Sequence, residues 1–234
     1  MKQIIKYLVL FSFVGTFLLS CDILEDFMPQ SEEAANKKQQ KENDKKFESQ
    51  WSLQERERAN SAKDVAYLSE EEKEVYYYLN LARINPSLFG RTYAKAFDGT
   101  IGYTKGYAFD ERKESLLQEL AQMDSLPVLK PSELLFESAD CFATEGGKQG
   151  IVGHDRSSTG CAKLNVAECC HYGGCYTGLG IVMSLLVDAG EKNESLGHRR
   201  ICLSNSYNFL GVAIRKHKKY EKTAVLDFSR EEME

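Results

Sequence analysis

Proline, tryptophan and long apolar runs are all scarce in this chain of 234 residues. It holds four prolines and one tryptophan. Its longest apolar stretch, Tyr7–Leu19, has 13 residues, fewer than the ~20 that a membrane-spanning helix needs. These shortages exclude collagen-like and multi-span membrane proteins, and a hydrophobic content of 42% argues against a wholly disordered chain. The length favours a single folded domain.

An excess of positive charge is missing too. The chain has 30 Lys and Arg against 35 Asp and Glu, a net charge of -5. Domains that bind nucleic acids usually carry a basic patch and a high pI. We therefore expect no nucleic-acid partner.

The N-terminus has the plan of an export signal. Two lysines precede the apolar stretch Tyr7–Leu19, and a serine and a cysteine follow it. The tetrapeptide Leu18-Leu19-Ser20-Cys21 resembles a bacterial lipobox, in which the cysteine is lipidated and becomes the mature N-terminus. We expect a lipoprotein signal peptide over residues 1–20 and a lipid on Cys21. An ordinary secretory signal with an incidental cysteine is the alternative.

The residues after Cys21 bear on which membrane the lipid enters. Asp22 beside the cysteine resembles an inner-membrane retention signal of enterobacteria. Acidic residues soon after the cysteine, here Asp22, Glu25 and Asp26, also resemble the surface-export signals of Bacteroidetes lipoproteins. We favour an extracytoplasmic protein that the lipid anchors to the bacterial outer membrane or cell surface.

Residues 21–64 are expected to form the lipidated cysteine and a disordered charged tether. The segment is dense in Glu, Lys, Gln, Asn and Ser, and it has too few apolar residues to offset the entropy cost of ordering it. Local docking of Trp51 and Leu53 on the domain is the alternative to a fully solvated spacer. The folded domain is then expected over residues 65–234.

Within that domain, helices come first and strands last. Ser69-Glu70-Glu71-Glu72 has capping-box spacing and predicts the start of a helix that must end before Pro86. Asn85-Pro86 then has the pattern of an N-cap and first-turn proline for a second helix. Further helices are expected near 114–123, 131–147 and 178–188, a strand over 164–168, and an antiparallel hairpin over 210–215 and 223–229. This order predicts an α+β domain.

Three polar residues lie where the local pattern calls for apolar ones, a conflict that tends to mark functional sites. Strand periodicity puts Glu168 on the same face as Val166. Helical periodicity puts Asp188 on the apolar face that holds Leu185, and His198 comes just before another apolar run. A satisfied, half-buried polar residue is the simpler interpretation of each one alone.

Several segments in order resemble the CAP superfamily, named for cysteine-rich secretory proteins, antigen 5 and pathogenesis-related proteins and also called the SCP domain. The resemblance covers about residues 70–229. It implies an α/β/α sandwich, with helices on both faces of a small antiparallel sheet, and a cleft formed by His154, Glu168, Asp188 and His198. The segments are Leu79–Pro86, Gly153-His154, Val166–Glu168, Leu185–Gly190, Gly197-His198-Arg199, Gly211–Ala213 and Val225–Phe228.

The chain departs from the family pattern at two places. Cys169 follows the motif glutamate where the family has an asparagine, which removes an amide that would help to fix the cleft. Asp188 stands where family members usually place a glutamate, and Glu191 and Glu194 lie nearby in the sequence.

Two neutral imidazoles with one or two carboxylates suit Zn²⁺ or another divalent metal, with a coordination position left open. The expected ligands are His154, His198 and Glu168. The same groups without a metal can do acid and base work, and both possibilities stay open. The other two histidines, His171 and His217, lie among polar residues, and we expect them at the surface.

Three functions are compatible with such a cleft. The family is associated with sterol and lipid binding, so a membrane-anchored protein that binds a small ligand or lipid is the first. The second is a metal-assisted hydrolase, and the third is a structural or host-interaction protein with an inert tetrad. The chain has no Gly-x-Ser-x-Gly sequence, and no motif places a serine or cysteine beside a base. We therefore favour binding over catalysis.

Six cysteines besides Cys21 form an even set in a chain that we expect to be exported, which favours disulfides. For Cys141, on a helix, a buried free thiol is the alternative to a disulfide. A zinc cluster with His171 is the rival interpretation, although the spacing does not fit common zinc motifs. At least one disulfide is expected to involve one of four residues near Glu168: Cys161, Cys169, Cys170 and Cys175.

Overall fold

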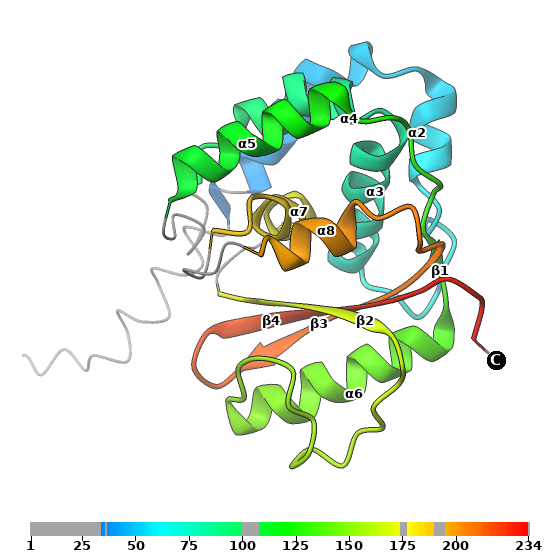
Figure 1. Cartoon of the computed structure of the whole chain (residues 1–234), viewed down its shortest axis with the longest axis vertical. Helices are drawn as coiled ribbons and strands as arrows, with labels where there is room; N and C mark the ends of the chain where they lie inside the picture. The colour runs from blue at the N-terminus through cyan, green and yellow to red at the C-terminus, as the bar shows by residue number, and fades with distance from the viewer. Residues whose placement is uncertain (1–33, 36, 100–107, 174–176, 190–194, 234) are drawn as a thin grey trace, which may run out of the picture.

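The computed structural model describes residues 34–35, 37–99, 108–173, 177–189 and 195–233. Figure 1 shows three layers, with a sheet between one long helix on one face and several helices on the other. From residue 48 onward, the helices are η1 (Glu48–Gln50), α2 (Leu53–Ala59), α3 (Glu70–Ile84), α4 (Pro86–Phe89), the π-helical η2 (Gly90–Ala94), α5 (Phe109–Gln122), α6 (Glu133–Gln149), α7 (Gly178–Val187) and α8 (Gly197–Cys202). The strands are β1 (Lys130–Pro131), β2 (Ala167–Tyr172), β3 (Phe209–His217) and β4 (Glu221–Ser229).

The first two predicted helices are confirmed, together with their caps. Ser69 Oγ accepts a hydrogen bond from the Glu72 amide at 3.3 Å, and the Glu72 carboxylate accepts one from the Ser69 amide at 2.7 Å. The Asn85 side chain accepts a hydrogen bond from the Leu88 amide at 3.1 Å, with Pro86 as the first residue of α4. Local sequence therefore determines where α3 and α4 begin.

The sequence predicts that α6 begins at Pro131, but the helix begins two residues later, at Glu133. Pro131 belongs to β1, in which it pairs with Leu210 in parallel. Ser132 is the N-cap, and its hydroxyl accepts a hydrogen bond from the Leu135 amide at 3.4 Å. A serine side chain satisfies a free amide at the helix start, which a proline ring cannot do.

The strand order is β1-β3-β4-β2, so β2 lies at an edge. The predicted hairpin is confirmed as β3 and β4, which pair antiparallel over longer spans than expected. Strand β2 pairs antiparallel with β4, but it begins at Ala167, so Leu164 precedes it. The parallel pair β1 and β3 makes the sheet mixed, whereas we expected an antiparallel one. The α+β class is confirmed.

Helices cover both faces of the sheet (Figure 1). Gly211 allows α6 to approach closely, because a Cβ at this position would lie 2.1 Å from the Leu135 carbonyl carbon. The opposite face packs on α3, α7 and α8 in a larger core. The small core between α6 and the sheet consists of Ala139, Phe142, Ala143, Cys170, Ala213 and Val225.

The segment before α3 is folded onto the domain. Residues 37–47 are helical, and Phe47 and Trp51 are buried at 5% and 3% exposure. Both rings pack on Tyr93, with centroid separations of 5.3 Å for Phe47 and 6.4 Å for Trp51. Ala59, at the end of α2, is fully buried as well.

The expected disordered tether over residues 21–64 is therefore wrong for 37–64. Trp51 docks on the domain, as the alternative interpretation predicts, whereas Leu53 is 63% exposed. A low average apolar content concealed a few aromatic side chains that each bury a large area. The signal peptide and the lipidation site Cys21 lie outside the described residues. In the part of the chain that the structure describes, every helix is too short or too polar to span a membrane.

One disulfide joins Cys141 and Cys161. This confirms a disulfide at one of the four expected cysteines and excludes the alternative of a free thiol at Cys141. Cys141 lies on α6, beside the loop that carries Cys161, and not inside the core between α6 and the sheet. Three other cysteines are buried free thiols: Cys169, Cys170 and Cys202. Cys175 lies outside the described residues.

Candidate functional site

Strand β2 carries functional side chains on both of its faces. Cys170 belongs to the small core beneath α6, whereas Cys169 belongs to the larger core on the opposite face. Because side chains alternate along a strand, Glu168 and Tyr172 share the α6 face with Cys170, and His171 shares the other face with Cys169.

His154 meets Glu168 on the α6 face. His154 Nδ1 lies 2.7 Å from Glu168 Oε1, with the imidazole 55% exposed and the carboxylate 12% exposed. The Tyr172 hydroxyl accepts a hydrogen bond from the Gly153 amide and donates one to the Gly153 carbonyl, both at 3.0 Å. Gly153 has a φ of +97°, a left-handed conformation that favours glycine. Tyr172 thus fixes the turn from which His154 reaches Glu168.

Arg156 bridges two carboxylates beneath this pair. Its guanidinium donates to Glu168 from Nε at 3.0 Å and from a terminal nitrogen, and to Asp227 at 3.1 Å. It also donates to the Ser138 carbonyl at 3.0 Å and lies 4.7 Å from the centre of the Phe142 ring. The side chain is only 6% exposed, so α6, β2 and β4 hold it in one orientation.

These contacts set the charge of both acids. Burial opposes ionisation of Glu168, but hydrogen bonds from His154 and Arg156 hold its pKa below the ordinary value. Burial raises the pKa of Asp227 to about 6, although Ser138 and Arg156 stabilise its anion. At neutral pH, Glu168 is therefore a fixed anion beside an exposed imidazole.

Asp188 and His198 form the second pair, at the junction of α7 and α8. Asp188 Oδ1 lies 2.8 Å from His198 Nδ1, and Oδ2 accepts a hydrogen bond from the His198 amide at 3.1 Å. Burial raises the pKa of Asp188, but the His198 contacts outweigh it and hold that pKa below the usual range. Asp188 is 12% exposed, in agreement with its predicted inward orientation. Glu191 and Glu194 lie outside the described residues.

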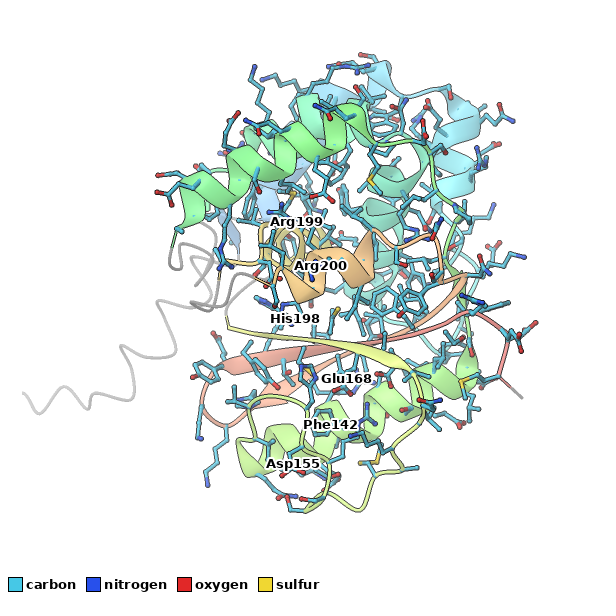
Figure 2. All side chains as sticks on the ribbon, in the orientation of Figure 1. Phe142, Asp155, Glu168, His198, Arg199 and Arg200 are labelled. Atoms are coloured by element: carbon cyan, nitrogen blue, oxygen red, sulfur yellow. A yellow bond between two sulfur atoms is a disulfide. The ribbon has the colours of Figure 1, made fainter. Side chains whose placement is uncertain are left out.

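The four predicted cleft residues thus form two imidazole–carboxylate pairs. In Figure 2, His198 lies on the α8 side of β2 and Glu168 lies on the α6 side. Among the described residues, one group of potential metal ligands has its donor atoms within 4.8 Å of one another. It consists of His154, Glu168 and Cys170. Metal ligation by His198 stays a prediction.

A pocket of about 220 Å³ opens beside the first pair. It joins one carboxylate and one imidazole to basic and aliphatic side chains, so polar and apolar parts of a ligand can both find contacts. Its lining consists of His154, Arg156, Lys163, Leu164, Val166 and Glu168. The predicted shared face of Val166 and Glu168 is therefore present, although Val166 precedes the strand.

Comparison with known proteins finds no relative of this chain. No protein-family model, curated protein or solved structure matches the chain.

The surface positions expected for the other two histidines are wrong. His171 is 8% exposed, and its Nδ1 lies 3.1 Å from Ser184 Oγ, while its Nε2 has no hydrogen-bond partner among the described residues. Burial, with a smaller contribution from His198, lowers the pKa of His171 to about 4. His217 is 4% exposed, and its Nε2 lies 2.8 Å from the Ile151 carbonyl oxygen. Polar sequence neighbours misled the prediction because tertiary packing covers both rings.

Sequence reasoning missed Arg156, Cys170, Tyr172 and Asp227 as parts of this site. Asp227 gave a usable signal, because it is a single carboxylate within an apolar strand and must find a partner. Arg156 lies two residues after His154 and gave no periodic signal. The roles of Cys170 and Tyr172 depend on the strand register that begins at Ala167.

Proposed function

We propose that this chain is a CAP-type, membrane-anchored extracytoplasmic lipoprotein that binds a small ligand in the cleft beside β2. The observation that supports it most is the pairing of His154 with Glu168 at 2.7 Å and of His198 with Asp188 at 2.8 Å. These are the four residues that the CAP resemblance assigns to its cleft, and the chain folds them into two matching contacts.

The layered fold agrees with this proposal. The chain has helices on both faces of a small sheet. Glu168 lies on the edge strand β2, and the Asp188–His198 pair lies at the junction of α7 and α8, which both contact β2. The lipid expected on Cys21 supplies the anchor, and the folded segment 37–64 then keeps the domain closer to the membrane than a fully extended tether would. A cleft held at a surface suits capture of a ligand from the surroundings.

The pocket favours a small molecule or a lipid headgroup over an enclosed acyl chain. About 220 Å³ is below the 300–1,000 Å³ that is typical of drug-sized ligand sites. Lys163 and the exposed imidazole of His154 suit an acidic group on the ligand, and Leu164 and Val166 suit a short apolar part. We infer a small amphipathic acid as the ligand class.

A divalent metal fits the donors of this cleft. Imidazole, carboxylate and thiolate groups are those that bind Zn²⁺, and a metal held here would supply a positive charge for an anionic ligand. His154 and Glu168 would hold it. The resemblance implies His198 as a third ligand, but His198 lies on the other side of β2 from Glu168 and outside the group of close donor atoms. This chain's own part is to orient the imidazole and to hold Glu168 ionised.

Native mass spectrometry of the full chain, extracted from its own host in mild detergent, tests the proposal. We expect one bound small molecule per chain, which the His154→Ala and His198→Ala double variant loses. Leu53→Ala, at an exposed residue far from the pairs in the sequence, serves as the matched control and should keep the molecule. A wild-type chain that carries no ligand, or a double variant that keeps it, would contradict ligand binding in this cleft.

The anchor is tested separately. An alkyne fatty acid supplied to the host should label the wild-type chain and should not label Cys21→Ala. Equal labelling of the two proteins would exclude lipidation at Cys21 and leave the cleft proposal unaffected.

A further inference from the structure

We propose that Cys170 completes a metal site with His154 and Glu168, and that this site takes a thiophilic divalent ion of the Zn²⁺ class. This inference rests on the metal in the proposed function and replaces His198 by a thiolate as the third ligand. It depends on features of this chain, namely a cysteine two residues after Glu168 and the turn that carries His154.

The distances between the donor atoms fit such a site. Cys170 Sγ lies 3.7 Å from His154 Nδ1 and 3.6 Å from Glu168 Oε1. In a tetrahedral zinc site with ordinary bond lengths, sulfur lies about 3.6 Å from each neighbouring nitrogen or oxygen ligand. Both sulfur distances therefore already match those of a zinc site.

The distance between the nitrogen and oxygen donors must increase slightly when a zinc ion binds. His154 Nδ1 and Glu168 Oε1 are 2.7 Å apart, at hydrogen-bond distance, and two such ligands on one zinc ion would lie about 3.4 Å apart. The ion would replace this hydrogen bond and separate the two atoms by roughly 0.7 Å. His154 can provide the movement because its side chain is 55% exposed.

The residues around the three donors orient them. Arg156 binds Glu168 through Oε2, which leaves Oε1 directed at His154 and Cys170. Tyr172 holds Gly153 by two hydrogen bonds of 3.0 Å and so places the following His154. Outer contacts of this kind orient ligands in known metal sites.

Charge and burial suit a neutral, half-enclosed site. One Zn²⁺, one carboxylate and one thiolate sum to zero charge, which limits the cost of burying the ion. Exposure rises from 6% at Cys170 through 12% at the Glu168 side chain to 55% at the His154 side chain. An ion can therefore enter beside His154, which lines the pocket together with Glu168. Sulfur and imidazole donors favour Zn²⁺ over Mg²⁺ and Ca²⁺, which prefer oxygen.

The strand supplies a matched control for the thiol. Cys169 and Cys170 are adjacent and both buried, but Cys169 faces the opposite core and contacts the His198 carbonyl oxygen at 4.0 Å. A substitution of either residue by serine makes the same chemical change at nearly the same burial. Only Cys170→Ser removes a proposed ligand.

Titration of the full-length, metal-free protein with Co²⁺, in oxygen-free buffer, tests the proposal. We expect one bound ion, the visible bands of tetrahedral cobalt and a near-ultraviolet thiolate-to-cobalt band in the wild type and in Cys169→Ser. Cys170→Ser should lose the thiolate band and bind Co²⁺ at least about 100-fold more weakly, since loss of an outer contact alone costs 10- to 100-fold. A thiolate band that persists in Cys170→Ser, or no band in the wild type, would overturn the proposal.

A second variant covers the case in which Cys170→Ser fails to fold. His154→Gln changes an exposed ligand, so it should keep the wild-type far-ultraviolet circular dichroism and still bind Co²⁺ about 100-fold more weakly. Unchanged Co²⁺ affinity in this folded variant would also overturn the site. His198→Ala should retain the thiolate band. If the metal site fails but the cleft variants still lose their small molecule, the binding function stands without this metal.

Discussion

The hydroxyl of Tyr172 binds both the amide and the carbonyl of Gly153, each at 3.0 Å. One side chain on β2 thus satisfies two backbone groups of the turn that leads to His154. Phenylalanine keeps the ring but leaves both groups without this partner. We predict that Tyr172→Phe lowers the free energy of unfolding by about 1–2 kcal/mol.

The same change should loosen His154. We expect Tyr172→Phe to weaken Co²⁺ binding about tenfold, as for other outer contacts of metal ligands, with the thiolate band retained. Urea unfolding gives the stability and cobalt titration gives the affinity. Tyr220→Phe is the control, because Tyr220 is 38% exposed and its ring also packs on Tyr172. Equal effects of the two substitutions would show that the Gly153 hydrogen bonds do not position the site.

The buried guanidinium of Arg156 should be more important for stability than any exposed charge. Arg156→Met leaves Glu168 and Asp227 buried without their cation, and breaking a buried ion pair in this way costs about 3–5 kcal/mol. The cost should be smaller at pH 5 than at pH 7, because the Asp227 pKa of about 6 lets that carboxyl take up a proton.

Urea unfolding at the two pH values measures this effect. Arg91→Met serves as the control. Arg91 is exposed, and its side chain donates a hydrogen bond to the Ser87 hydroxyl. We expect the control to change stability by less than about 0.5 kcal/mol. Equal costs for Arg91→Met and Arg156→Met would contradict the bridging role of Arg156.

The parts of the fold that local rules determine could be predicted from the sequence. The capping box at Ser69, the Asn85-Pro86 start of α4 and the hairpin of β3 and β4 all follow from neighbouring residues. The start of α6 was misplaced because Pro131 pairs with β3, a contact made across almost 80 positions of sequence.

The candidate site could be predicted only in part, because its contacts join distant segments. The family resemblance pointed to His154, Glu168, Asp188 and His198, and the structure pairs them as two couples. It did not point to Cys170, whose proximity to His154 depends on the register of β2 and on the conformation of the Gly153 turn. The burial of His171 likewise depends on packing against α7 that no local pattern reveals.

The packing of Trp51 predicts that the segment before α3 stabilises the domain. Trp51 is 3% exposed and contacts Tyr93, so Trp51→Ala should lower the free energy of unfolding by about 3–5 kcal/mol. Leu53→Ala, two residues later and 63% exposed, should change it by less than about 0.5 kcal/mol. Equal and small effects in chemical denaturation would restore the interpretation of this segment as a solvated tether.

The depressed pKa of His171 predicts that acid weakens the fold. Burial, and secondarily His198, lowers this pKa from 6.5 to about 4, so between these pH values the unfolded chain binds a proton that the folded chain does not. The free energy of unfolding therefore falls as the pH drops through this window, by up to about 3 kcal/mol from this group. The raised pKa of Asp227 acts in the opposite direction over part of the same window, so the raw stability curve mixes both groups.

A comparison with His171→Asn isolates the histidine. Asparagine can still reach Ser184 with an amide group in place of Nδ1, but it does not titrate, and the contribution of Asp227 is the same in both proteins. We expect the stability of the wild type relative to His171→Asn to decrease steadily from pH 7 to pH 4 in urea unfolding. Parallel stability curves would mean that His171 takes up its proton in the folded state as easily as in the unfolded chain. That result would contradict the prediction that His171 stays neutral in the folded protein.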